Sequence, residues 1–215
     1  MIEIAPSILA ANNSNLEKEV IEVDQAGADY IHIDVMDGNY VPNTAFGPNT
    51  VKNLRSLTNK TLDVHLMVKP VKNHIETYAK AYADIISFHP EADLEPLEVI
   101  DLIKKNNCKP GIAIHPNIKV ADIESYLKLV NIVVVMTVIP GFSGQKFMND
   151  QISKISLLKK FRDKNNLSFK IEADGGINQE TGAICKKNGA DILVAGSYIY
   201  NAHYTKYKNL IESLR

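Results

Sequence analysis

The sequence has almost no excess of charge of either sign. Its 24 lysine and arginine residues nearly balance 25 aspartate and glutamate residues, which leaves a formal net charge of −1. A broad electrostatic surface for nucleic acid or an anionic membrane is therefore not expected, although a local anion pocket is compatible with this balance. Cysteine is also scarce. Cys108 and Cys185 stand alone without CxxC spacing, so the sequence predicts reduced thiols, and neither a zinc knuckle nor a disulfide framework.

Long apolar segments are missing as well. The longest apolar run, IVVVMTVI at 132–139, is much shorter than the roughly 20 residues that a membrane-spanning helix needs. The first nine residues have a strand pattern that contains Pro6, and they lack the basic n-region of a signal peptide. These absences predict a cytoplasmic protein.

Short β-rich runs alternate with longer segments of helical period along the chain. The strand candidates are EIAPSIL (3–9), YIHIDVM (30–36), TLDVHLM (61–67), DIISFHP (84–90), PGIAIHP (110–116), IVVVMTV (132–138), FKIEAD (169–174) and DILVAGS (191–197). Strict alternation implies parallel strands joined by right-handed crossovers. Eight such units fit a closed barrel better than an open doubly wound sheet. No linker-like segment interrupts them, so we expect one α/β domain over residues 1–215, a (β/α)8 TIM barrel.

Polar side chains share one face of two neighbouring strands. His32 and Asp34 alternate with apolar residues in the first strand, His65 follows the same pattern in the second, and Asp174 stands at a third strand end. Because active sites of such barrels lie at the carboxyl ends of the strands, these four side chains are expected to converge. Two imidazoles and two carboxylates suit one divalent ion such as Zn²⁺, Fe²⁺, Mn²⁺ or Co²⁺. Either histidine alone is more typical of a hydrogen-bonded core residue.

The strand ends and the loops after them carry two further regularities. Three methionines near strand ends are either core filler or a soft wall beside an electron-rich intermediate: Met36, Met67 and Met136. Glycines are frequent after the last three strands, in PGFSGQ (140–145), GGI (175–177) and AGS (195–197). Glycine lets the main chain approach an anion closely, so these loops predict a phosphate pocket, although each glycine pair alone is typical of a turn.

Six blocks of the sequence resemble the ribulose-phosphate 3-epimerase family, in the correct order and through nearly the whole chain. They are IAPSILAA (4–11), HIDVMDGNYVPN (32–43), DVHLMV (63–68), MTVIPGFSGQKF (136–147), ADGGI (173–177) and VAGS (194–197). The resemblance implies a metal-dependent enzyme that inverts carbon 3 of D-ribulose 5-phosphate to give D-xylulose 5-phosphate through an enediolate.

The resemblance also implies a role for each matching residue. One divalent metal ion per chain is held by His32, Asp34, His65 and Asp174, and the two aspartates are the catalytic acid and base. The residues implied to bind substrate and its phosphate are Ser7, His65, Gly141, Phe142, Ser143, Gly144, Asp174, Gly175, Gly176, Gly196 and Ser197. A homo-oligomer is expected for such a barrel.

Four positions depart from the family pattern and leave the preferred sugar open: His115, Ile139, Thr44 and Ala45. One alternative is a 3-epimerase of a hexulose 6-phosphate such as allulose 6-phosphate. Another is a metal-free isomerase or decarboxylase on a phosphate-binding barrel. A third is a barrel that binds sugar phosphate without catalysis, as a regulator or scaffold.

Overall fold

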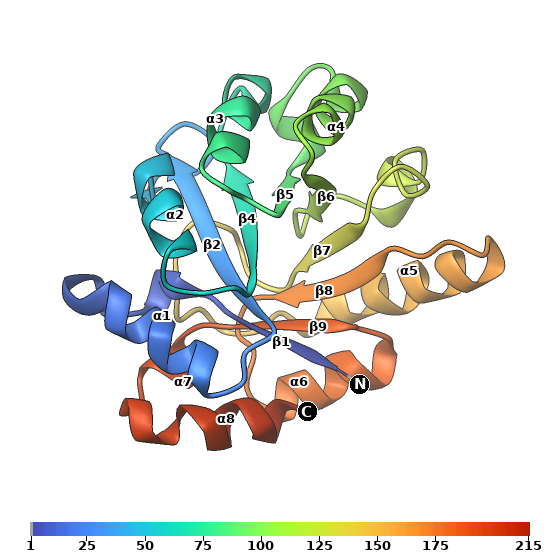
Figure 1. Cartoon of the computed structure of the whole chain (residues 1–215). Coiled ribbons are helices and arrows are strands. Elements are labelled where there is room, and N and C mark those ends of the chain that lie inside the picture. Colours follow the sequence, from blue (N-terminus) through green and yellow to red (C-terminus); the bar gives the residue numbers. More distant parts are fainter. Residues whose placement is uncertain (1) are drawn as a thin grey trace.

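The computed structural model describes residues 2–215, so Met1, where the expected domain begins, lies outside the described part. Its centre is one sheet, seen end-on in Figure 1. The strands are β1 (Glu3–Pro6), β2 (Tyr30–Asp37), β3 (Thr44–Ala45), β4 (Thr61–Met67), β5 (Ile85–Phe88), β6 (Lys109–Ile114), β7 (Ile132–Met136), β8 (Lys170–Asp174) and β9 (Ile192–Ala195). Their order in the sheet is β1-β9-β8-β7-β6-β5-β4-β2-β3.

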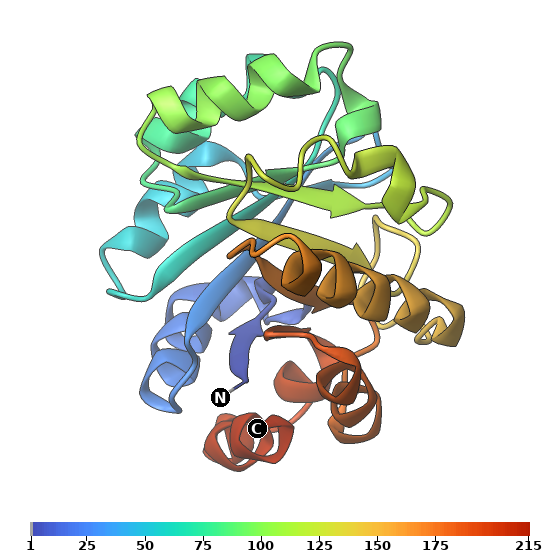
Figure 2. The same ribbon diagram turned by 90° about the vertical axis from the view of Figure 1, so that its right-hand side faces the viewer.

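The two ends of this sheet meet and form a barrel. All neighbouring strands are parallel except the short β3, which pairs antiparallel with the end of β2. An isolated parallel bridge between Ser7, directly after β1, and His32 in β2 closes the ring. Helices surround it on the outside (Figures 1 and 2). The (β/α)8 barrel predicted from the sequence is therefore confirmed.

The helices follow the strands in the expected alternation, with one exception. The α-helices are α1 (Leu16–Gln25), α2 (Pro48–Arg55), α3 (Ile75–Lys80), α4 (Pro96–Lys105), α5 (Ile152–Lys164), α6 (Gln179–Asn188), α7 (Ser197–Tyr200) and α8 (Tyr207–Leu214). Short 3-10 helices span Ile8–Ala10, Asn13–Asn15, Val71–Asn73, Pro90–Ala92, Val120–Ile123, Asn149–Gln151 and Tyr204–Lys206. None of the helices in residues 2–215 is long and apolar enough to cross a membrane.

The connection from β6 to β7 is the exception, because it contains only the 3-10 helix Val120–Ile123 and turns. The expectation of a strict alternation is wrong there. The segment nevertheless buries Val120, Ile123 and Leu127, which have helical spacing. It therefore covers the barrel as a helix would.

The strand boundaries differ from the sequence pattern where a turn begins early. The strand expected over 3–9 ends at Pro6, because the Ser7 side chain accepts a hydrogen bond from the Leu9 amide at 3.4 Å and caps the next 3-10 helix. The strand expected over 191–197 ends at Ala195, where Gly196 precedes α7. β3 was not predicted, since two residues are too few to show a period.

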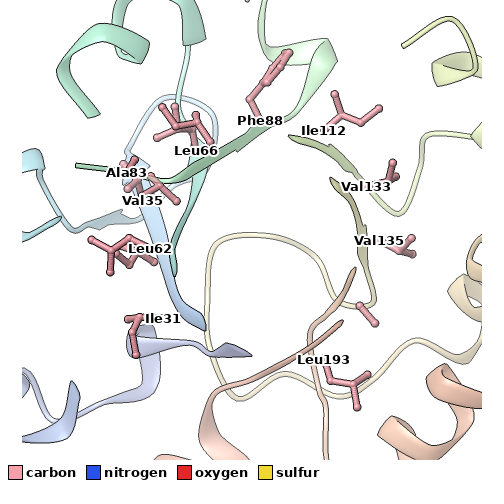
Figure 3. Close-up of a cluster of buried hydrophobic side chains, with 14 of the residues drawn as sticks. Ile31, Val35, Leu62, Leu66, Ala83, Phe88, Ile112, Val133, Val135 and Leu193 are labelled. Carbon is pink, nitrogen blue, oxygen red and sulfur yellow. The ribbon is translucent and has the colours of Figure 1, made fainter. Parts of the chain in front are cut away.

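Side chains along each strand point alternately outward, toward the helices, and inward, toward the barrel axis, so the barrel has an outer and an inner core. Side chains such as Ile31, Val35 and Leu66 point away from the centre and pack under the helices, as Figure 3 shows. The inward set is apolar on β7 and β9, where it includes Val134 and Val194. On β2, β4 and β8 the inward set includes buried polar side chains such as His32, Asp63 and Glu172. The fold thus gathers its buried polar side chains on part of the inner wall.

Candidate active site

Strand register brings the polar side chains together. The pairing of β2 with β4 sets Asp34 beside His65, and Asp174 is the last residue of β8. One ligand atom from each of His32, Asp34, His65 and Asp174 lies within 4.8 Å of the others, and all four residues are buried. The structure therefore assembles the four residues that the sequence singled out.

The atoms that face one another are two nitrogens and two carboxylate groups. His32 Nε2 lies 3.4 Å from Asp34 Oδ1 and 3.8 Å from Asp174 Oδ2. His65 Nδ1 lies 3.1 Å from Asp34 Oδ1 and 3.7 Å from Asp174 Oδ2. Within residues 2–215, the buried His32 Nε2 has no hydrogen-bond partner. A buried nitrogen without a partner and two carboxylates form a donor set that fits a divalent metal ion.

Other side chains orient this group from outside. The Ser7 hydroxyl donates to Asp34 Oδ2 at 2.7 Å, and His32 Nδ1 lies 2.7 Å from Asp63 Oδ2 and 3.3 Å from Glu172 Oε1. Such contacts fix the rotamer and tautomer of a side chain that binds a metal. Asp63 and Glu172 thus belong to the outer layer of the cluster.

The two aspartates differ in their affinity for protons. Burial opposes ionisation of Asp34, but the adjacent His32 and His65 outweigh it and hold the pKa of this carboxyl well below its usual range. Burial and the negative charge of Asp34 raise the pKa of Asp174 to about 6. Burial, together with Asp63, likewise raises the pKa of Glu172 to about 8. The site therefore has a surplus of buried acidic groups, which a cation would neutralise.

A cavity opens above the cluster at the carboxyl ends of the strands. Asp34 and Asp174 form part of its lining, whereas His32 and His65 are fully buried beneath it. The other predicted residues in the lining are Ser7, Met36, Met67, Met136, Gly141, Phe142, Ser143, Gly144, Gly175, Gly176, Gly196 and Ser197. The expected site residues other than His32 and His65 thus line one cavity.

The glycine pair after β8 is required by the backbone. Gly175 and Gly176 have φ values of +120° and +64°, which other residues rarely adopt. A Cβ at Gly175 would lie 2.4 Å from the Val138 side chain. Thr137 Oγ1 donates to the Gly175 carbonyl at 2.6 Å and so fixes the chain directly after Asp174. Thr137 was not singled out from the sequence, where a threonine in a strand carries no such signal.

His89 is another residue that the sequence analysis missed. It follows β5, is fully buried, and its Nε2 lies 3.0 Å from His65 Nε2. Tyr40 stacks on its ring with 4.7 Å between centroids, and burial lowers the pKa of His89 to about 4. The available signal was a histidine in the expected strand 84–90, near its end.

The four positions that depart from the family pattern do not line the cavity. His115 and Ile139 border a neighbouring groove, and Thr44 and Ala45 lie in β3 and border a second one. Ala45 nevertheless packs against Met36 and Met67 of the lining.

The fold and the site define a β/α-barrel enzyme with a buried His/Asp cluster that could hold a metal ion. The model of the ribulose-phosphate 3-epimerase family matches residues 3–200, and the chain belongs to this family. A ribulose-phosphate 3-epimerase of Bacillus subtilis is 44% identical over 201 residues, which are 93% of each chain. The enzyme of the same name from Escherichia coli K12 is 37% identical over 99% of this chain and 94% of its own.

A solved structure supports the fold independently. The crystal structure of KGPDC from Streptococcus mutans aligns with 100% of this chain and 95% of its own, with a TM-score of 0.71 and 13% identity. At this identity the likeness concerns the fold alone.

The family and its named relatives establish the activity. The chain is an epimerase that acts at carbon 3 of ribulose phosphate. The hexulose 6-phosphate alternative is not favoured by these relatives.

Proposed function

We propose that Asp34 and Asp174 are the acid and base of this epimerase. The observation that carries the proposal is that two carboxyl groups from different strands reach one cavity with very different pKa values. β1 and β9 separate β2 from β8 in the ring, so the two groups approach from different directions without lying directly opposite. One aspartate removes the proton from one face of carbon 3, and the other returns a proton to the opposite face.

The two carboxyl groups differ in protonation in the metal-free protein. Asp34 stays ionised, whereas the raised pKa of Asp174 lets it carry a proton near neutral pH. The Ser7 hydroxyl donates to Asp34 and holds it in place. The Thr137 hydroxyl donates to the carbonyl of Gly175 and so fixes the chain directly after Asp174. Met36, Met67 and Met136 would give the enediolate a dry, polarisable wall.

We propose further that one divalent ion, Zn²⁺, Fe²⁺, Mn²⁺ or Co²⁺, binds between His32, Asp34, His65 and Asp174. The unpartnered His32 Nε2 and the surplus of acidic groups support this assignment. Such an ion would act as a Lewis acid and stabilise the negative charge that develops on the substrate oxygens.

We also propose that the substrate phosphate binds in the glycine loops of the cavity. The described lining includes no lysine or arginine, so the available donors are main-chain amides and neutral side chains such as those of Ser143 and Ser197. The loops concerned are those of Gly141–Gly144, which includes Phe142 and Ser143, Gly175–Gly176 and Gly196–Ser197. Ser7 is proposed to touch the sugar.

Three broader assignments remain proposals from the sequence. They are a single domain over residues 1–215, a homo-oligomer, and a cytoplasmic location. The two free thiols Cys108 and Cys185 support the last of these.

Isotope exchange in Asp34→Asn and Asp174→Asn tests the two-base assignment. Neither variant should interconvert the epimers, but each should still exchange the carbon 3 hydrogen in D₂O for one epimer, and the two variants should prefer opposite epimers. The exposed Asp101→Asn is the matched control, and metal content is measured in every sample. A metal-replete variant that epimerises within about tenfold of the parent rate, a difference of only about 1.4 kcal/mol, would contradict the assignment.

A further inference from the structure

The two histidines of the cluster have different partners on their outer nitrogens. His32 Nδ1 faces the Asp63 carboxylate at 2.7 Å, which is the usual partner of a histidine that binds a metal. His65 Nε2 instead faces another imidazole, that of His89, at 3.0 Å. Both His65 and His89 are fully buried. A hydrogen bond between two ring nitrogens contains one proton, so one ring donates and the other accepts.

The direction of this hydrogen bond determines whether His65 can bind a cation. Its inner nitrogen, Nδ1, faces Asp34 and Asp174 at 3.1 and 3.7 Å. Only a ring nitrogen without a proton offers a lone pair to a metal. If neutral His65 donates from Nε2, Nδ1 is free for the cation. If His89 donates instead, the proton of neutral His65 stands on Nδ1, and the ligand is lost.

Glu91 favours the first arrangement. Its Oε1 is 3.5 Å from His89 Nδ1, a buried nitrogen that has no hydrogen-bond partner among residues 2–215, and this carboxylate oxygen faces it. The Tyr40 hydroxyl donates to the same oxygen at 2.8 Å, and the Tyr40 ring stacks on His89. A carboxylate stabilises an N–H group that points toward it, so the proton of His89 belongs on Nδ1. His89 Nε2 is then an acceptor, and His65 must donate to it.

We propose that His89 is a positioning residue that, with Glu91, fixes the tautomer of His65. The chain Glu91–His89–His65 keeps a proton on His65 Nε2 and leaves Nδ1 available for a divalent cation. This inference rests on the metal site of the proposed function. His89 does not line the cavity, so its effect passes through His65 rather than through substrate contact.

Metal affinity tests this Glu91–His89–His65 chain of contacts, called the relay below, without any measurement of activity. Metal-free protein is titrated with Co²⁺ or Zn²⁺ against a chromophoric chelator. His89→Phe keeps a ring beside Tyr40 but removes the acceptor, and should weaken binding by about 10- to 100-fold. His89→Gln, which can present an amide oxygen near the same place, should restore part of the loss. His115→Phe is the matched control, because His115 has no hydrogen bond to a proposed ligand, and should bind like the parent.

Two further measurements do not depend on replacing a fully buried ring. Glu91→Gln changes a side chain that is 33% exposed, and should weaken binding in the same direction by a smaller factor. In zinc-loaded parent protein with ¹⁵N-labelled histidine, long-range ¹H–¹⁵N spectra should show His89 protonated on Nδ1 and His65 protonated on Nε2.

The outcomes separate this inference from the metal proposal with the help of His65→Ala. If His65→Ala loses the metal while His89→Phe and Glu91→Gln bind like the parent, the relay is wrong and the metal site stands. A His89 ring protonated on Nε2 also overturns the relay. If His65→Ala itself binds like the parent, the metal site and the relay both fail.

Discussion

Replacement of Asp174 by asparagine should stabilise the metal-free protein at alkaline pH while it stops epimerisation. Asp174 is buried, and its carboxyl faces the ionised Asp34 across the cluster. Ionisation of Asp174 therefore works against folding. Asparagine has nearly the same shape as the protonated aspartate and cannot ionise, so the variant escapes this cost.

The size of the effect follows from the pKa of Asp174. The pKa rises from the ordinary 3.8 to about 6 on folding, so the native state holds the proton more tightly than the unfolded state. The stability lost by ionisation is absent well below pH 3.8, grows between 3.8 and 6, and is complete above pH 6. At 1.36 kcal/mol for each pKa unit, the full loss is about 3 kcal/mol, and at pH 4.5 it is about 1 kcal/mol.

Urea unfolding of parent and Asp174→Asn in the presence of EDTA measures this difference directly. The variant should be more stable by about 3 kcal/mol at pH 8 and by about 1 kcal/mol at pH 4.5. Asp101→Asn, at an exposed position on α4, should show no such pH dependence. A variant no more stable than the parent at pH 8, or an advantage that is the same at both pH values, would refute the reasoning.

Two other predictions concern the phosphate pocket and the thiols. Ser197→Asp brings a negative charge to the proposed phosphate site and should raise the KM for ribulose 5-phosphate at least about tenfold, whereas the exposed Ser153→Asp should not. An unchanged KM would show that the phosphate binds elsewhere. Burial raises the pKa of Cys108 to about 11 and that of Cys185 to about 12, so both should resist iodoacetamide at pH 8 until urea unfolds the chain. Rapid labelling of the native protein would contradict this expectation.

The parts of the fold that the sequence predicted well are those with a strong period. β4 has the bounds expected for 61–67, and β2 extends the expected 30–36 by one residue. In both strands, apolar residues alternate with polar ones, because the outer face packs under helices and the inner face holds the cluster. The same alternation alone predicts that His32 and Asp34 share one face of their strand, and that His65 lies on the corresponding face of the next.

The parts that the sequence did not predict depend on contacts between distant residues. The hydrogen bond of Ser7 to Asp34 spans 27 positions, and the contact of His65 with His89 spans 24. No local period reports such a contact. The missing helix between β6 and β7 is a related case, since 3-10 turns bury Val120 and Ile123 at the same spacing that a helix would use.

The instability predicted at Asp174 and its proposed task have the same physical origin. A carboxyl that returns a proton to carbon 3 must hold one for part of the time near neutral pH, which an exposed aspartate does not. In the metal-free protein, the wall of the barrel gives Asp174 this property by burying it beside Asp34, whose own charge is stabilised by His32 and His65. An apolar residue at the end of β8 would continue the inner core of β7 and β9 and remove the free-energy cost of ionising a buried carboxyl. It would also remove one of the two carboxyl groups to which we assign proton transfer at carbon 3.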